Sequence, residues 1–301
     1  MSVQSAGRWR LVAPRGGAAH HHSPAPLKGS RFARNGLAVA GVVVVTLFLL
    51  FCFVGPLIYS TDQTHTDLTQ VNLSPSGAHW LGTDAVGHDE LGRLMYGGRV
   101  SLLVGLAAGV LATVIGTLWG AVAGYAGGWV DAAMMRIVDA GIAIPALFIL
   151  LVVSAITTPD TAGLILVLGL VSWLVPSRLV RAETLTLKSR DYVLTLRATG
   201  GTHTRAVTRH ILPNSVSTIV VAATFQVADA ILLIAYVSYL GLGVQPPKTD
   251  WGGMLSAGLT AAYSGRWWLI VPPGLAIILV VCAFNAIGDG LRDAFDVKGR
   301  A

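Results

Sequence analysis

The sequence predicts an all-α integral membrane protein with six transmembrane helices, and three observations support this prediction. Only 12% of the 301 residues are charged, against about 25% in soluble globular proteins. Charge-free runs recur along the chain, and most approach the roughly 20 residues that a helix needs to cross the hydrocarbon core. The 35 glycines are typical of membrane helices, since glycine lets neighbouring helices pack closely.

Six runs are predicted to span the bilayer. They lie near residues 36–59, 100–123, 139–157, 162–177, 215–238 and 267–288. Buried helices of a large soluble core are the alternative, but six such runs in a chain of 301 residues argue against it. The implied organisation is a disordered tail (1–35), the first span with an external segment (36–99), a core of five spans (100–290) and a second tail (291–301).

The charge distribution predicts the orientation of the chain. Six basic residues and no acidic residue precede the first span, and residues 178–214 hold seven basic and two acidic residues. The segment 60–99 instead holds two basic and five acidic residues. Because Lys and Arg mark the cytoplasmic side, both termini are expected in the cytoplasm, with 60–99 and 239–266 outside. This distribution also argues against nucleic acid, a partner that the net charge of +6 could suggest.

Three segments carry further packing signals. Residues 89–99 place their apolar side chains on one helical face, which favours an interfacial amphipathic helix leading into the second span. Arg136 and Asp139 are expected to form an orienting pair at the cytoplasmic end of the third span. A stripe of small residues in the second span predicts a close packing face. Its members are Gly105, Gly109, Gly116, Gly120 and Gly124.

The segment 178–214 is too long for a simple connection between two spans. It is predicted to form a helix, a bend at Gly200-Gly201 and a second amphipathic helix to about His210. Leu212-Pro213-Asn214 are expected to end that helix and to start the fifth span. A helical elbow with a basic face suits contact with a cytoplasmic partner, and a solvated loop without a partner is the alternative.

The same segment resembles the cytoplasmic coupling loop of bacterial ABC importer permeases. "DYVLTLRATG" (191–200) is followed by "RHILPN" (209–214), so Gly200 and Leu212-Pro213 match the Gly and Leu-Pro of that loop at its usual spacing. Leu194-Thr195-Leu196 stand where the loop usually has Glu-Ala-Ala. Three further segments resemble the peptide/nickel branch, and within it the second permease of dipeptide and oligopeptide importers. They are "HWLGTDAVGHDELGRLMYGGRVSL" (79–102), "SYLGLGVQPPKTDWGGML" (238–255) and "GDGLRDAFD" (288–296).

The resemblance implies a type I ABC importer permease fold and a set of partners. The chain would form half of the translocation path for dipeptides or oligopeptides in a bacterial cell membrane, surrounded by lipid and paired with a second permease subunit. Two cytoplasmic ATPase subunits would use ATP and Mg²⁺, and an external solute-binding protein would deliver the solute. The sequence lacks the phosphate-cradling G-x-x-x-x-G-K-[ST] loop. Separate ATPase chains must therefore supply the energy. We also expect no bound cofactor, catalytic residue or metal site in this chain.

The resemblance also implies two groups of site residues. The first group would couple the chain to the ATPase subunits and consists of Leu194, Thr195, Leu196, Gly200, Leu212 and Pro213. The second group would dock the binding protein or form an external gate, and consists of Asp84, Asp89, Gln245, Pro246 and Trp251.

Asp229 is the one charged residue in the interior of a predicted span. A carboxylate near the membrane centre costs about 2.5–3.5 kcal/mol on insertion scales, so Asp229 should face the bundle interior or water. It could line the translocation path and meet the amino terminus of a peptide. It could equally be a structural acid that is hydrogen-bonded to a neighbouring helix. Similar permeases often carry an acid about five residues later, where this chain has Ile234.

Two other functions are weighed against peptide import. The first is import of nickel or another small solute by a permease of the same branch, since the binding protein largely sets solute choice. The second is an intramembrane enzyme, which would need a buried Ser-His pair, a metal-binding His-Glu-x-x-His or two facing aspartates. Asp229 has no second aspartate at the centre of a span, and the histidines lie outside the apolar centres.

Overall fold

The computed structural model describes residues 32–295, so the tails predicted at 1–35 and 291–301 lie largely outside the described residues. The described part is a helical bundle whose only β feature is an isolated bridge between Thr83 and Asp89. Its α-helices are α2 (Gly36–Phe53), α3 (Gly55–Ile58), α4 (Glu90–Ala126), α5 (Gly128–Ile142), α6 (Ala146–Thr157), α7 (Thr161–Ser172), α8 (Leu174–Lys188), α9 (Asp191–Ala198), α10 (His203–Ala206), α11 (Leu212–Tyr239), α12 (Trp251–Leu259) and α13 (Val271–Phe295).

The number of spans agrees with the sequence prediction, but two spans differ in shape. Four continuous helical stretches are long and apolar enough to cross a membrane: Gly36–Ile58, Glu90–Ala126, His203–Tyr239 and Trp267–Phe295. The third and fourth spans are bent helix pairs, α5–α6 with an angle of 75° and α7–α8 with an angle of 45°. Counting each bent pair as one span gives six among the described residues.

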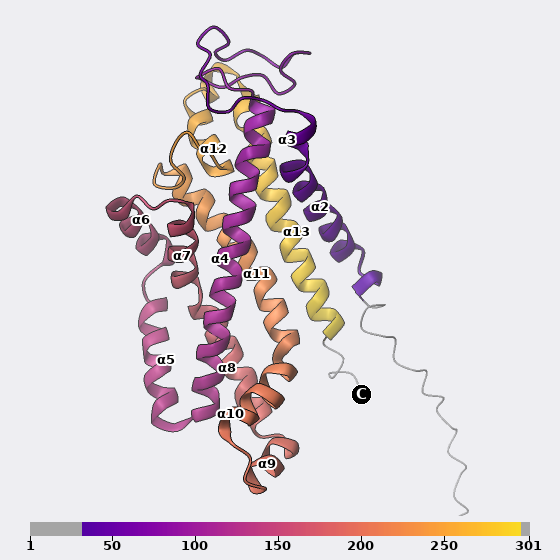
Figure 1. Ribbon diagram of the computed structural model, residues 1–301, viewed down its shortest axis with the longest axis vertical. Helices are drawn as coiled ribbons and strands as arrows, with labels where there is room; N and C mark the ends of the chain where they lie inside the picture. The colour runs from indigo at the N-terminus through magenta and orange to yellow at the C-terminus, as the bar shows by residue number, and fades with distance from the viewer. Residues whose placement is uncertain (1–31, 296–301) are drawn as a thin grey trace, which may run out of the picture.

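Helix α4 forms the axis of the bundle and touches α8, α11, α7 and α2 (Figure 1). The predicted glycine face is confirmed, because these glycines leave room for neighbouring backbones. A Cβ atom on Gly116 would lie 2.7 Å from the carbonyl oxygen of Trp173 before α8, and one on Gly109 would lie 2.8 Å from the Cα of Val227 in α11. The stripe therefore sets the close approach of α4 to both helices.

The amphipathic helix predicted at 89–99 to lead into the second span is present as the first turns of α4. Helix α4 runs without a break from Glu90, and the carboxylate of Asp89 caps it by accepting a hydrogen bond from the N–H of Gly92 at 2.8 Å. Gly97 and Gly98 could have interrupted the helix, but they pack closely against Asp250 and Trp251. Tertiary packing thus overrides the weak helix propensity of the glycine pair.

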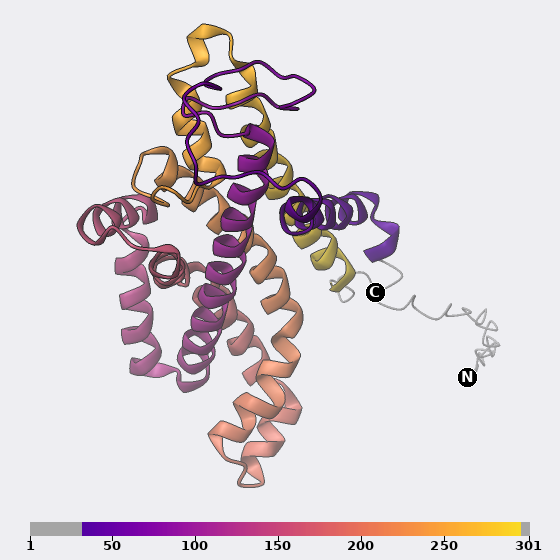
Figure 2. The same ribbon diagram turned by 45° about the horizontal axis from the view of Figure 1, so that its top comes forward.

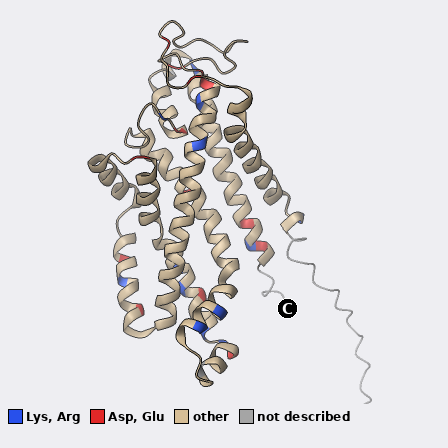
Figure 3. Cartoon of the chain, in the orientation of Figure 1, with Lys and Arg blue, Asp and Glu red and all other residues tan. Residues whose placement is uncertain are grey.

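The two ends of the bundle differ in character. Helices α9 and α10 lie at one end, and α12 lies at the other with the long segment that precedes α4 (Figure 1). We refer to these as the α9 end and the α12 end. Charged residues gather toward both ends and are sparse in between, as expected for a chain that crosses a bilayer (Figure 3). Helix α2 lies at the edge of the bundle against α13 (Figure 2).

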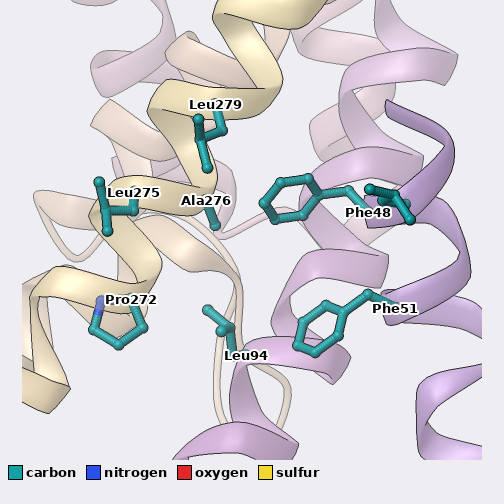
Figure 4. Close-up of a pocket in the computed structure, with 8 residues that line it drawn as sticks. Phe48, Phe51, Leu94, Pro272, Leu275, Ala276 and Leu279 are labelled. Carbon is teal, nitrogen blue, oxygen red and sulfur yellow. The ribbon is translucent and has the colours of Figure 1, made fainter. Parts of the chain in front are cut away.

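An apolar pocket of about 280 Å³ lies between α2, α4 and α13 (Figure 4). Its lining residues are Leu47, Phe48, Phe51, Leu94, Pro272, Leu275, Ala276 and Leu279. The ring of Phe48 also packs edge-on against Trp251, with ring centroids 5.7 Å apart. This pocket contains no polar side chain and is part of how α2 packs onto the bundle.

Candidate functional site

The segment that resembles a coupling loop forms an ordered helical elbow at the α9 end. Helix α9 ends in a turn in which Gly200 adopts φ +83° and the N–H of Gly201 donates to the carbonyl oxygen of Leu196 at 2.8 Å. This is the Schellman arrangement, in which the left-handed residue after the helix is nearly always Gly or Asn. The predicted bend at Gly200, between two short helices, is present.

The second half of the segment departs from the prediction at Pro213. Leu212-Pro213-Asn214 do not end a helix, because the helical stretch continues from His203 to Tyr239. Proline has no N–H and its ring clashes with the carbonyl four residues earlier. The backbone widens to a π-helical turn over Val207–Ile211 just before it. Side chains also donate to carbonyls at the end of this turn: Asn214 Nδ2 donates to His210 O at 2.5 Å and Ser215 Oγ to Ile211 O at 2.9 Å.

Tyr125, at the end of α4, ties the elbow to the bundle. Lys188 Nζ donates to the carbonyl oxygen of Tyr125 at 2.5 Å and lies 5.4 Å from its ring centroid. His203 Nδ1 lies 3.3 Å from the Tyr125 hydroxyl. The sequence analysis missed this contact, since Tyr125 and His203 are 78 residues apart. The apolar cluster around the ring consists of Leu187, Ala206 and Ile211, with Leu196 and Val207 packed against it.

The expected coupling residues divide by exposure. Leu194, Thr195, Gly200 and Pro213 are exposed, whereas Leu196 and Leu212 are half-buried. Leu196 packs into the cluster around Tyr125. The exposed residues are therefore available to a partner, and Leu196 holds the elbow in place.

Asp229 lies in a second pocket, of about 360 Å³, beside α11. The other polar side chains of its lining belong to Gln226, Ser172 and Tyr236. Among the described residues Asp229 has no hydrogen-bond or ion-pair partner, and its side chain is exposed in this chain. The structural alternative, an acid hydrogen-bonded to a neighbouring helix of the same chain, is not what the structure shows. Asp229 lies ten residues before the end of α11, about 15 Å along the helix axis, which places it well inside a membrane.

The expected docking surface at the α12 end needs correction at two acidic residues. Asp89 is 5% exposed, and its Oδ2 atom lies 2.8 Å from the Tyr59 hydroxyl and 2.9 Å from His79 Nδ1. Asp84 is paired with Arg93, whose Nε lies 3.3 Å from Asp84 Oδ2. Both carboxylates hold the segment before α4 onto that helix, so they are structural.

Trp251 also needs correction, because its side chain is fully buried. Its indole N–H donates to the carbonyl oxygen of Leu94 at 3.0 Å, and its backbone N–H donates to Ser101 Oγ at 3.1 Å. It therefore joins α12 to α4. Gln245 and Pro246, in contrast, are exposed in the loop between α11 and α12.

The predicted pairing of Arg136 with Asp139 is wrong. Asp139 Oδ1 instead lies 2.5 Å from a guanidinium nitrogen of Arg178 in α8. A second link between the same helices is bidentate, since Arg181 donates to both carboxylate oxygens of Asp131 at 2.5 and 2.6 Å. No local signal in the sequence could identify partners that are 39 and 50 residues apart.

Comparisons with known proteins agree with this architecture. Residues 116–300 match the family model described as binding-protein-dependent transport system inner membrane component. Residues 29–75 match the N-terminal TM domain of oligopeptide transport permease C.

Relatives cover nearly the whole chain. A protein of Brucella suis biovar 1 (strain 1330), whose name places it among the peptide permeases, is 43% identical over 91% of both chains. The oligopeptide transport system permease protein OppC of Escherichia coli (strain K12) is 40% identical over 90% of both chains. The dipeptide transport system permease protein DppC of Bacillus subtilis (strain 168) is 37% identical over 90% of this chain and 84% of its own.

These relatives are transport permeases, so the alternative of an intramembrane enzyme is wrong. The chain therefore belongs to the family of inner membrane components of binding-protein-dependent transport systems, as a multi-pass permease subunit of the DppC/OppC type.

Proposed function

We propose that this chain is one of two membrane subunits of an ATP-driven peptide importer in a bacterial cell membrane. Two cytoplasmic ATPase subunits and an external solute-binding protein complete the proposed assembly. Peptides are favoured over nickel because the similar permeases carry the names of dipeptide and oligopeptide systems. ATP and Mg²⁺ are used by the ATPase subunits, and this chain supplies half of the path and its mechanical coupling.

The observation that carries the proposal is the continuous helical stretch from His203 to Tyr239. It starts in the coupling elbow and carries Asp229 into the second pocket. When the ATPase subunits close on ATP, they displace the elbow. Because packed helices move as rigid bodies, the displacement reaches the pocket, where Asp229 lines the path.

The proposed orientation places the α9 end and both termini in the cytoplasm. The α12 end then faces outward, and Gln245 and Pro246 are exposed there for the binding protein. We expect a cysteine at the exposed position of Thr66 to react with an impermeant thiol reagent only from outside, and one at Thr204 only from inside. Cys52 and Cys282 are replaced by alanine in both variants. Labelling of both positions from the same side would contradict the orientation.

A pair of glycine substitutions tests the coupling. Gly200 (φ +83°) and Gly265 (φ +71°) both have open space where a Cβ would stand, and they lie at opposite ends of the bundle. Aspartate therefore introduces similar backbone strain at each position. We expect Gly200→Asp to leave the permease inserted but to abolish co-purification of the ATPase subunits and peptide uptake. Gly265→Asp should retain the ATPase subunits. Normal docking and uptake by Gly200→Asp would defeat the coupling assignment.

A further inference from the structure

The second pocket lies where both broken spans meet α11. The break between α5 and α6 contributes Ile142, Ile144, Pro145 and Ala146 to its lining, and the break between α7 and α8 contributes Ser172, Leu174 and Val175. Helix α11 lies beside both breaks and completes the lining with Gln226, Asp229, Leu232, Leu233 and Tyr236. Its volume of about 360 Å³ falls within the range of roughly 300–1,000 Å³ that is usual for small-molecule sites.

Three polar groups in this pocket lack partners. Gln226 is 7% exposed, lines the pocket and has no hydrogen bond from its side chain among the described residues. The hydroxyl of Ser172 is buried without a partner. Asp229 is the only charged side chain among the lining residues. Asp229 is exposed in this chain, whereas Gln226 and the hydroxyl of Ser172 are buried. Because buried polar groups are almost always hydrogen-bonded, two unpaired ones beside a free carboxylate point to a ligand that pairs them.

The chemistry of these groups specifies the ligand. A lone carboxylate in an apolar surrounding attracts a cation, and an amide side chain offers one donor group and one acceptor to a second amide. Gln226 and Asp229 are three residues apart on one face of α11, about 4.5 Å along the axis. One residue of an extended peptide spans about 3.3–3.6 Å. The spacing therefore fits an ammonium group at Asp229 and the first peptide bond beside Gln226.

The surroundings fit the rest of such a ligand. Tyr236 lies seven residues beyond Asp229, two helical turns away on the same face, and its ring can stack on an amide or a cation. Pro145 and Ala146, in the lining, mark the start of α6. The positive end of that helix dipole favours a carbonyl oxygen or a carboxylate. Leu232 and Leu233 provide apolar room for a side chain.

We propose that this pocket is a subsite that binds the amino-terminal end of a peptide, with Asp229 on the α-ammonium group and Gln226 on the first peptide bond. The proposal rests on the proposed function, because it assumes that peptides cross the membrane through this subunit. It adds which end of the solute the chain recognises. It also identifies Gln226 and Ser172 as ligand-contacting residues that the sequence analysis did not single out.

Photolabelling of the complete complex tests the subsite directly. Proteoliposomes that contain both permeases, the ATPase subunits and the binding protein would receive a free-amine tripeptide with a diazirine side chain at its first or third position. We expect the first-position probe to label residues 226–236 at least about fivefold more than the third-position probe. Equal labelling by the two probes, or no labelling of α11 while both peptides are taken up, would overturn the proposal.

Substitutions provide the matched controls. Asp229→Asn and Gln226→Leu should each lower labelling by the first-position probe at least about fivefold. Asp139→Asn removes a carboxylate from another membrane helix, outside the pocket, and should leave the labelling unchanged. Equal loss in all three variants would overturn the assignment. If the wild-type complex takes up neither peptide, the proposed function itself fails, and the subsite fails with it.

Discussion

Two pockets of comparable volume lie among the membrane helices, and they differ in what lines them. The pocket between α2 and α13 has about 280 Å³ and only apolar side chains. The pocket beside α11 has about 360 Å³ and contains Gln226, Asp229 and Ser172. An unpaired buried polar group costs about 1–3 kcal/mol, and a carboxylate inside the membrane costs about 2.5–3.5 kcal/mol. The volume of a pocket therefore says little about its function here. Polar side chains that lack partners lower the stability of the fold, and their presence in one pocket points to a role in transport.

The largest expected difference is between Asp229→Leu and Phe48→Leu. Each substitution places leucine in one of the two pockets. Loss of a charged hydrogen-bond partner worth about 1.5–3 kcal/mol corresponds to a decrease in uptake of roughly tenfold to a hundredfold. We expect that decrease for Asp229→Leu, and uptake within about twofold of wild type for Phe48→Leu. The measurement is initial uptake rate at matched membrane levels. Equal uptake by the two variants would remove the distinction between the pockets.

Asp229→Asn should retain more uptake than Asp229→Leu, because asparagine keeps hydrogen bonds although it loses the charge. We expect a decrease of roughly threefold to tenfold, as about 1 kcal/mol of the interaction is lost. The same uptake assay compares the two variants with wild type. Wild-type rates in both would show that Asp229 is neither a pathway residue nor a structural one.

Tyr125→Ala should weaken the mechanical link between the coupling elbow and the second pocket, which contains Asp229. The substitution removes the ring at the centre of the cluster of Leu187, Ala206 and Ile211, so motion of the elbow would reach α11 less completely. We expect ATP hydrolysis to continue while uptake falls severalfold, which raises the number of ATP molecules used per peptide. Tyr125→Phe keeps the packing and should behave like wild type. An unchanged ratio of ATP to peptide in Tyr125→Ala would contradict this role.

Phe48→Ala should give the smallest effect on transport and a measurable effect on stability. It removes the ring that packs on Trp251, an aromatic contact worth about 0.5–1.5 kcal/mol beyond the area that it buries. Thermal denaturation in detergent should occur a few degrees lower, with uptake per inserted molecule unchanged. A loss of uptake without a loss of stability would show that the apolar pocket takes part in transport.

Some features of the fold and of the candidate site can be predicted from the sequence, and others cannot. Long charge-free runs identify spans because each helix must cover the hydrocarbon core alone. Gly200 is predictable because few residues adopt positive φ. The bends at Pro145 and near Trp173 are hidden because the residues around each break, such as Ala143 and Ile144 or Trp173 and Leu174, are themselves apolar. Pro213 misleads because a π-helical turn over Val207–Ile211 precedes it and lets the helix continue past it.

Contacts between residues that are far apart in the sequence account for the other features that the sequence did not predict. Asp139 has Arg136 within one helical turn but pairs with Arg178, 39 residues away. Trp251 lies in a segment that resembles an external loop, yet its indole is buried against α4. Gln226 has no distinguishing sequence context, and only the structure shows that it lines the same pocket as Asp229 without a hydrogen-bond partner among the described residues.

The most direct test of a translocation path along α11 is whether water reaches the second pocket, beside α11, and not the apolar pocket between α2 and α13. Single cysteines at Leu233 and Leu279 would report on the two pockets in a chain whose Cys52 and Cys282 are replaced by alanine. We predict that a water-soluble thiol reagent modifies the cysteine at 233, at a rate that differs severalfold between the nucleotide-free and ATP-trapped complexes. The cysteine at 279 should remain unmodified in both states. Equal reactivity at the two positions, or no reaction at 233 in either state, would contradict a translocation path along α11.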